Sequence, residues 1–127
     1  MAVRVSIDQG ALNALLRSPS GPVARELYRR GKRVEAAAKR LVGVDTGRLR
    51  ASISTDLIAR GGVPVARVGT RVRYGLVHHE GHGWIYPKRP GGRLVFRPKG
   101  SRTLVFATKV RPVPGTHYLT RALPAAR

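Results

Sequence analysis

The sequence predicts an α+β fold in which a long helix and a short C-terminal helix pack on an antiparallel sheet. Apolar residues recur at helical spacing between Val23 and Leu41. Two stretches with strand composition follow, residues 53–59 and 63–72, and Arg60-Gly61-Gly62 between them has the composition of a hairpin turn. Helical spacing returns over residues 117–126, with Thr116 as a possible cap, so helices flank the predicted sheet along the chain.

The N-terminal stretch predicts a short strand and a short helix. Apolar and polar side chains alternate over residues 3–7, a period of two that is typical of a half-buried strand. Asp8 can then cap a helix whose leucines share one face. Residues 18–22, Ser-Pro-Ser-Gly-Pro, contain only turn-favouring or helix-breaking types, so we expect this helix to end before them.

The long helix carries an apolar stripe and a basic remainder, and it should end near Val42-Gly43. The basic surface is either a solvated face, which is the simpler interpretation and the one we favour, or a surface that meets an anionic partner. The stripe consists of Val23, Leu27, Val34, Ala38 and Leu41, widened by Ala24 and Ala37; the basic residues are Arg25, Arg29, Lys32, Arg33, Lys39 and Arg40.

A short helical segment should join the long helix to the strands. Asp45 and Thr46 are both good N-cap residues, because a side-chain oxygen can accept from the free backbone N–H groups of the next turn. Over residues 48–52 the pattern allows one or two turns, with Leu49 and Ile53 four apart on the face toward the core.

The region after the two strands is rich in glycine, proline and arginine. Residues 74–79 could form a third strand or begin a loop, and the glycines after Glu80 force a break. Residues 84–86 and 94–96 flank residues 87–92 like the arms of a long hairpin or an extended loop. A further strand is expected over residues 104–106 and 108–111.

Composition describes a small, strongly basic chain. Its 127 residues suit a single domain spanning residues 1–127. With 25 Lys and Arg against 6 Asp and Glu, the formal net charge is +19, so we expect a polyanion or an acidic protein surface as partner. Cysteine is absent, and no segment resembles a membrane span or a signal peptide, so we expect a soluble protein made in a cytoplasm.

The residues predict no enzyme, no cofactor and no metal centre. His78-His79-Glu80-Gly81-His82 is the only ligand-like cluster in the sequence, and on a strand His78, Glu80 and His82 would share one side. Glycines interrupt the helix that a zinc-protease motif needs, so a structural role is the better interpretation. The few carboxylates are scattered, which leaves little material for acid–base catalysis.

Trp84 and Tyr86 lie among basic residues, and two interpretations are open. They could form a stacking surface for single-stranded nucleic acid. Alternatively they anchor the hairpin in the core while the charges face outward, which is the interpretation we favour. No recognition helix or zinc finger is evident, so sequence-specific readout is not expected.

Four segments carry a family resemblance. They are Asp45-Thr-Gly-Arg-Leu-Arg-Ala-Ser-Ile53, Val68-Gly-Thr70, Tyr74 with Val77-His-His-Glu-Gly81, and Pro114-Gly-Thr-His-Tyr-Leu-Thr-Arg-Ala-Leu123. In this order and spacing they resemble the neck, or tail-completion, proteins of long-tailed bacteriophages, which sit between the capsid portal and the tail tube. The chain departs from the family pattern at His82, where threonine is usual, and in the longer segment from Trp84 to Val113. The motif residues are Asp45, Thr46, Gly47, Leu49, Gly69, Tyr74, Glu80, Gly81, Leu119 and Leu123.

The resemblance implies a structural virion protein. We expect a homo-oligomeric ring, sixfold by preference and twelvefold as the second choice, that contacts connector and tail-tube proteins while genomic DNA passes through. A free-standing, sequence-independent nucleic-acid-binding module is the alternative, and a toxin-like nuclease is a distant third because acidic residues are so few. The residues expected to face DNA or a neighbouring protein are Arg48, Arg50, Lys88, Arg89, Arg93, Arg97, Lys99 and Arg102.

Overall fold

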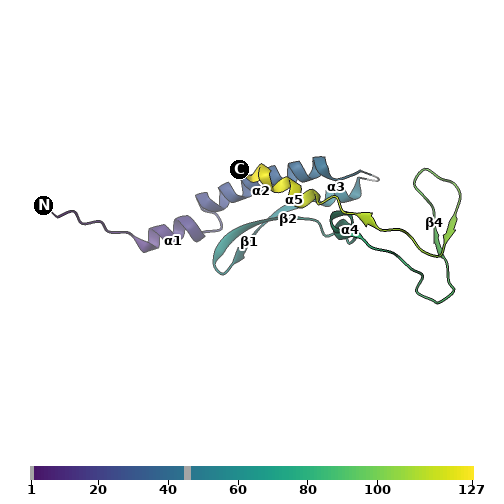
Figure 1. The fold of residues 1–127 in the computed structure, drawn as a ribbon. Helices are drawn as coiled ribbons and strands as arrows, with labels where there is room; N and C mark the ends of the chain where they lie inside the picture. The colour runs from purple at the N-terminus through teal and green to yellow at the C-terminus, as the bar shows by residue number, and fades with distance from the viewer. Residues whose placement is uncertain (1, 45–46) are drawn as a thin grey trace. The chain divides into compact units, whose positions relative to one another are not determined.

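A computed structural model describes residues 2–44 and 47–127 (Figure 1). Within these residues the chain contains helices and three small antiparallel sheets, which confirms the predicted α+β class. The contacts divide the chain into two compact units, Met1–Gly75 with Tyr118–Arg127, and Leu76–His117. The expectation of a single domain stays a prediction, because a compact cluster of contacts can be part of a larger folding unit.

The N-terminal segment of the first unit is exposed and irregular. Residues 2–8 form no strand, so the strand predicted over residues 3–7 is wrong; Val3 is 87% exposed. Alternation alone cannot build a strand, which needs a neighbour for its backbone hydrogen bonds. The predicted cap is confirmed: helix α1 (Gln9–Arg17) begins where Asp8 Oδ1 accepts from the backbone N–H of Ala11 at 3.1 Å.

Helix α2 (Pro22–Leu41) is the long helix of the prediction, starting one residue earlier. Proline suits this first position because a backbone N–H there would have no partner within the helix. One face is buried, and it includes Val34 and Ala38 of the predicted stripe; the full buried set is Ala24, Gly31, Val34, Glu35, Ala37 and Ala38.

Strands β1 (Ser54–Arg60) and β2 (Val63–Gly69) form the predicted hairpin. Gly61 and Gly62 have φ of 60° and 77°, the left-handed values that a two-residue turn between antiparallel strands requires. Both strands pack on α2. Helix and hairpin lie close together at Gly31, where a Cβ atom would lie 2.6 Å from Thr55 Cγ2.

The core of the first unit joins three helices. It contains side chains from α2, from α3 (Arg48–Ser52) and from α5 (Tyr118–Ala122), with Ile53 just before β1. The predicted inward face of the short helix is confirmed, since Leu49 and Ile53 are buried. The short helix η1 (Leu123–Ala126) follows α5. Leu123, an apolar residue of the stretch with helical spacing over residues 117–126, is exposed. The core residues are Val34, Ala37, Ala38, Val42, Leu49, Ile53, Tyr118 and Ala122.

Glycine, and not one of the two predicted capping residues, stands directly before α3. Gly47 occupies the N-cap position with φ of 80°. Asp45 and Thr46, the predicted capping residues, lie outside the described residues.

Helix α4 (Tyr74–Glu80) replaces the strand or loop predicted for residues 74–79. The break predicted at the glycines after Glu80 is confirmed, because α4 ends at Glu80 and Gly81 has φ of 79°; left-handed glycine at this position commonly terminates a helix. A side chain at Gly81 would also overlap the backbone at Val113, so close packing fixes glycine here. The three histidines therefore do not share a strand with Glu80: His78 and His79 lie in α4, and His82 lies in β3.

The second unit is built around one long hairpin, which we call the arm (Gly81–Pro114). Its strands are β3 (Gly81–His82) paired with β6 (Val113–Pro114), and β4 (Leu94–Phe96) paired with β5 (Val105–Ala107). A single bridge joins Ile85 and Val110 between these two pairs. The pairings are nested, so the long hairpin is confirmed. However, residues 84–86 do not pair with residues 94–96 as predicted, because residues 86–93 bulge out opposite residues 108–109.

Among the helices of residues 2–44 and 47–127, none combines the length and the apolar composition needed to cross a bilayer.

Candidate interaction surfaces

The second unit has no buried core of its own. No residue from Leu76 to His117 is buried, although this stretch contains many large apolar side chains. A two-stranded hairpin is marginally stable in water, and apolar side chains left in solvent lose the main driving force of folding. The exposed large apolar residues here are Leu76, Val77, Trp84, Ile85, Tyr86, Val95, Phe96, Leu104, Val105, Phe106 and Val113.

The distal hairpin of the arm, β4 and β5, is apolar on both faces. Val95 lies opposite Phe106, and on the other face Phe96 lies opposite Val105. Side chains of neighbouring positions in a strand point to opposite faces, so no packing onto a single surface covers both pairs. Phe106 is 59% exposed. The hairpin therefore presents two apolar faces that a partner would have to enclose.

Two tight turns of the arm each contain one of the predicted basic residues, Arg89 and Lys99. In the first turn the backbone N–H of Gly92 donates to Arg89 O at 3.0 Å, with Pro90 and the left-handed Gly91 (φ 73°) in the central positions. In the second, Ser101 N–H donates to Pro98 O at 3.0 Å, and Lys99 lies within the turn. The predicted basic residues of the arm are all exposed, and they are Lys88, Arg89, Arg93, Arg97, Lys99 and Arg102.

The aromatic residues of the arm do not anchor it in a core, so the interpretation favoured from the sequence is wrong. Tyr86 is 62% exposed, and Trp84 is also exposed. Lys109 Nζ lies 4.7 Å from the centre of the Trp84 ring, a cation–π arrangement. Their surroundings explain the exposure: Trp84 and Tyr86 flank the isolated Ile85–Val110 bridge, where no further strand or helix of the second unit covers them.

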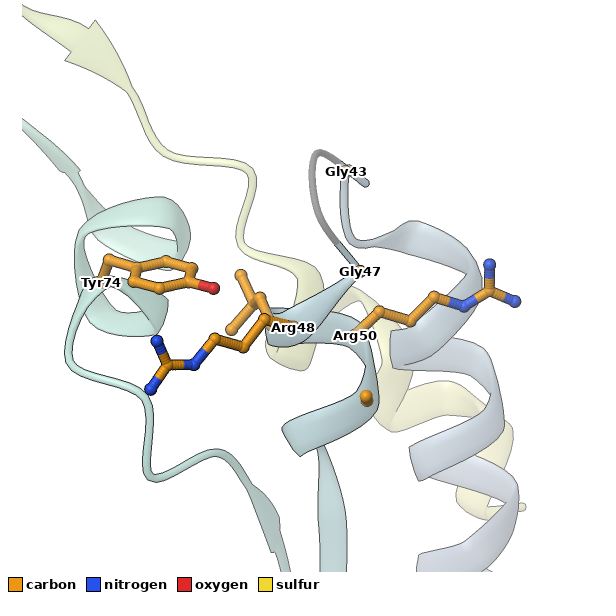
Figure 2. Close-up of a pocket in the computed structure, with 7 residues that line it drawn as sticks. Gly43, Gly47, Arg48, Arg50 and Tyr74 are labelled. Carbon is orange, nitrogen blue, oxygen red and sulfur yellow. The ribbon is translucent and has the colours of Figure 1, made fainter.

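A second basic surface surrounds α3 in the first unit (Figure 2). Arg48 extends to the side on which Tyr74 lies, whereas Arg50 extends away on the other side of the helix. Both arginines are exposed, as predicted. With Gly43, Gly47, Leu49 and Ala51 they line an open hollow of about 820 Å³.

The basic face of α2 is partly neutralised within the helix, which favours the solvated interpretation. Glu26 forms ion pairs with Arg29, Arg30 and Arg33. All four side chains are well exposed, so these pairs contribute little to stability.

Sequence reasoning missed a buried carboxylate on the opposite face of α2. Glu35 is 6% exposed and accepts hydrogen bonds from Thr55 Oγ1 at 2.7 Å, Lys32 Nζ at 2.8 Å and Lys39 Nζ at 2.9 Å. Burial raises the pKa of the Glu35 carboxyl, but the hydrogen bonds outweigh burial and lower this pKa to about 2. The lysines three before and four after Glu35 were a visible signal, because both positions face it on a helix.

The family-motif residues serve different structural purposes. Leu49 is buried, Leu119 packs against the core, and Gly47 and Gly81 hold left-handed backbone at a helix start and a helix end. Gly69 ends β2, Tyr74 begins α4, and Glu80 ends it.

Comparison with known protein families, with curated proteins and with solved structures finds no match to this chain.

Proposed function

We propose that this protein is a structural subunit of the head-to-tail connector of a long-tailed bacteriophage. In this proposal it forms a neck or tail-completion ring that joins the portal-side connector to the tail tube, and genomic DNA passes through the ring in the virion. Six subunits form the ring by preference, and twelve are the second choice. The protein has no catalytic role.

The arm is the observation that supports this proposal best. Its apolar side chains lie on both faces of a hairpin, and none of them is buried. Contact with other molecules that remove these side chains from water would therefore stabilise the second unit. A closed ring supplies such a surface from neighbouring copies, because each head-to-tail contact repeats until the rotation closes. Apolar strands among basic turns would then dock on protein, while the turns meet acidic surfaces or DNA.

The test removes the distal hairpin in register. Residues 95–106 are replaced by Asn-Gly, because the paired Leu94 and Ala107, which are kept, mark positions close enough for a two-residue turn. Expressed in a host infected by phage lacking the gene, this variant should fold but leave filled heads and tails unjoined in electron micrographs. Infectious, joined particles at the wild-type level would refute the proposal.

A charge control separates the loss of apolar surface from the loss of basic side chains. The same deletion removes Arg97, Lys99 and Arg102, so the control keeps the hairpin and changes these three residues to serine. This triple variant should still join most heads to tails, because the apolar faces that dock remain.

A free-standing nucleic-acid-binding module remains the second candidate, and the exposed Trp84 and Tyr86 favour it. Aromatic rings beside lysines can stack on bases while the cations contact phosphates. Under this alternative the protein binds DNA strongly, and the distal hairpin deletion has no effect on virion assembly.

A further inference from the structure

The C-terminal end of α4 and the segment after β6 bring together three metal-ligating residues. His79, Glu80 and His117 each place one ligand atom within 4.8 Å of the other two. This group is not the trio considered from the sequence, since His79 and His117 take the places of His78 and His82 beside Glu80. The histidine side chains meet edge to face, with ring centres 5.3 Å apart, and His79 Nδ1 lies 3.0 Å from Glu80 Oε1.

Hydrogen bonds to the backbone carbonyls at the end of α4 hold the two segments of this group together. His117 N–H donates to His79 O at 3.0 Å, and Thr116 donates to His78 O through both its backbone N–H (3.1 Å) and its hydroxyl (3.0 Å). A side chain at Gly115 would overlap the carbonyl of His79, so glycine permits this close crossing. His117 has φ of 48°, a left-handed conformation that non-glycine residues rarely adopt. Several independent contacts thus hold the backbone of His117 beside the end of α4.

We propose that His79, Glu80 and His117 bind one divalent transition-metal ion, Zn²⁺ by preference. Two imidazoles and a carboxylate suit zinc, cobalt and nickel, whereas magnesium prefers oxygen ligands. Ligand atoms about 2.0–2.2 Å from a tetrahedral ion lie about 3.4 Å from one another. The ligand atoms now lie up to 4.8 Å apart, so the side chains must rotate to reach this spacing, and Glu80, whose side chain is 59% exposed, has room to rotate. The fourth position stays open to water or to a partner's side chain.

The ion joins the two ends of the arm. His79 and Glu80 come immediately before Gly81, and His117 follows Pro114 by three residues. Coordination therefore reinforces the β3–β6 pair at the base of the arm, which consists of only two residues on each side. A metal that binds only this arrangement stabilises it by mass action. This inference does not depend on the proposed connector function.

Cobalt titration of untagged, metal-free protein tests the site. Co²⁺ should bind one ion per chain and give the visible absorption of a four-coordinate ion, and Zn²⁺ should displace it. Glu80→Gln and His117→Asn should each weaken binding at least about tenfold. Asparagine is chosen because it tolerates left-handed backbone. His82→Asn is the matched control and should bind like the wild type.

Several results would overturn the site. These are a wild-type affinity no higher than that of His117→Asn, an equal loss in His82→Asn, or equal binding of Mg²⁺. Circular dichroism of each variant, together with amide hydrogen exchange of Gly81, His82 and Val113 with and without Zn²⁺, separates lost ligation from lost folding. Zinc should slow exchange at these residues in the wild type and not in a folded His117→Asn variant.

Discussion

Glu35 places a negative charge inside the contact between α2 and the β1–β2 hairpin. Its hydroxyl partner, Thr55, comes from the hairpin, and its two ammonium partners come from its own helix. A buried carboxylate of this kind is stable only while all its partners remain, since an unpaired buried charge is costly. The residue therefore links the position of the hairpin to the protonation state of one side chain.

The lowered pKa of Glu35 predicts a loss of stability in acid. A carboxyl whose pKa is about 2 in the folded state, against 4.5 for an unperturbed glutamate, stabilises the fold fully above pH 4.5, and this contribution falls as the pH drops from 4.5 to 2. Allowing for solvent screening around the half-exposed Lys32, the contribution is about 2 kcal/mol. Urea unfolding at pH 7 and pH 2.5 measures it as the difference between wild type and Glu35→Gln.

Glu26→Gln is the control for this experiment. Glu26 also pairs with basic residues of α2, but its side chain is 44% exposed. This substitution should change stability by less than about 0.5 kcal/mol at either pH. If Glu35→Gln and the wild type lose equal stability on acidification, the charged network at Glu35 is not what couples folding to pH.

At the scale of elements, Gly31 sets how closely α2 approaches the hairpin. Thr55 cannot simply rotate away from a new methyl group at this position, because its hydroxyl is bonded to Glu35. Gly31→Ala should therefore destabilise the protein by roughly 1–3 kcal/mol, although alanine is the better helix former. Gly10→Ala in α1, where the nearest atom would lie 3.3 Å away, is the matched control and should be neutral or stabilising. Denaturation midpoints that rise for both variants would contradict the packing argument.

Elements governed by local pattern were predictable from the sequence. Helix α2 follows from its apolar period, and the β1–β2 turn follows from two consecutive glycines. Helix α4 was not predictable, because it spans only about two turns and its seven residues include a glycine and a valine, which are both poor helix formers. The alternation over residues 3–7 is as regular as that of a true strand, yet no partner strand lies beside it.

Among the candidate site residues too, those governed by local properties were predictable and those governed by distant contacts were not. Exposure of the basic residues follows from their charge alone, and every one of the predicted set is exposed. The aromatic residues were misjudged, because their burial depends on whether another element covers the arm. His117 could not be joined to His79 from the sequence, because only the nested pairing of the arm brings its two ends together.

At the scale of the whole molecule, a charge of +19 opposes any contact between copies of this chain. Apolar faces on the arm favour that contact, so the two effects compete. Added salt screens the repulsion and leaves the apolar attraction in place. Under the connector proposal, the isolated protein should thus be monomeric at low salt. It should associate as the salt concentration rises, or when a neighbouring ring of the connector neutralises its positive charge.

DNA binding should respond to salt in the opposite direction. Each phosphate contact releases counterions, so affinity should fall steeply between about 50 and 200 mM salt, with little difference between unrelated duplexes. Light scattering for self-association and fluorescence anisotropy for DNA binding, over one salt series, measure both trends on the same preparation. A strong sequence preference that persists in high salt would contradict binding through charge.

The substitution Phe106→Thr should separate the expected self-association from the expected DNA binding. The substitution removes a large, exposed apolar side chain from the distal hairpin and keeps the charge, so salt-induced association should be lost while DNA affinity stays within about twofold. Val63→Thr, an exposed apolar position in β2, is the matched control and should still associate. A wild-type protein that stays monomeric across the whole series and still binds DNA tightly would favour the free-standing module over the ring, because nothing would then use the apolar faces of the arm between subunits.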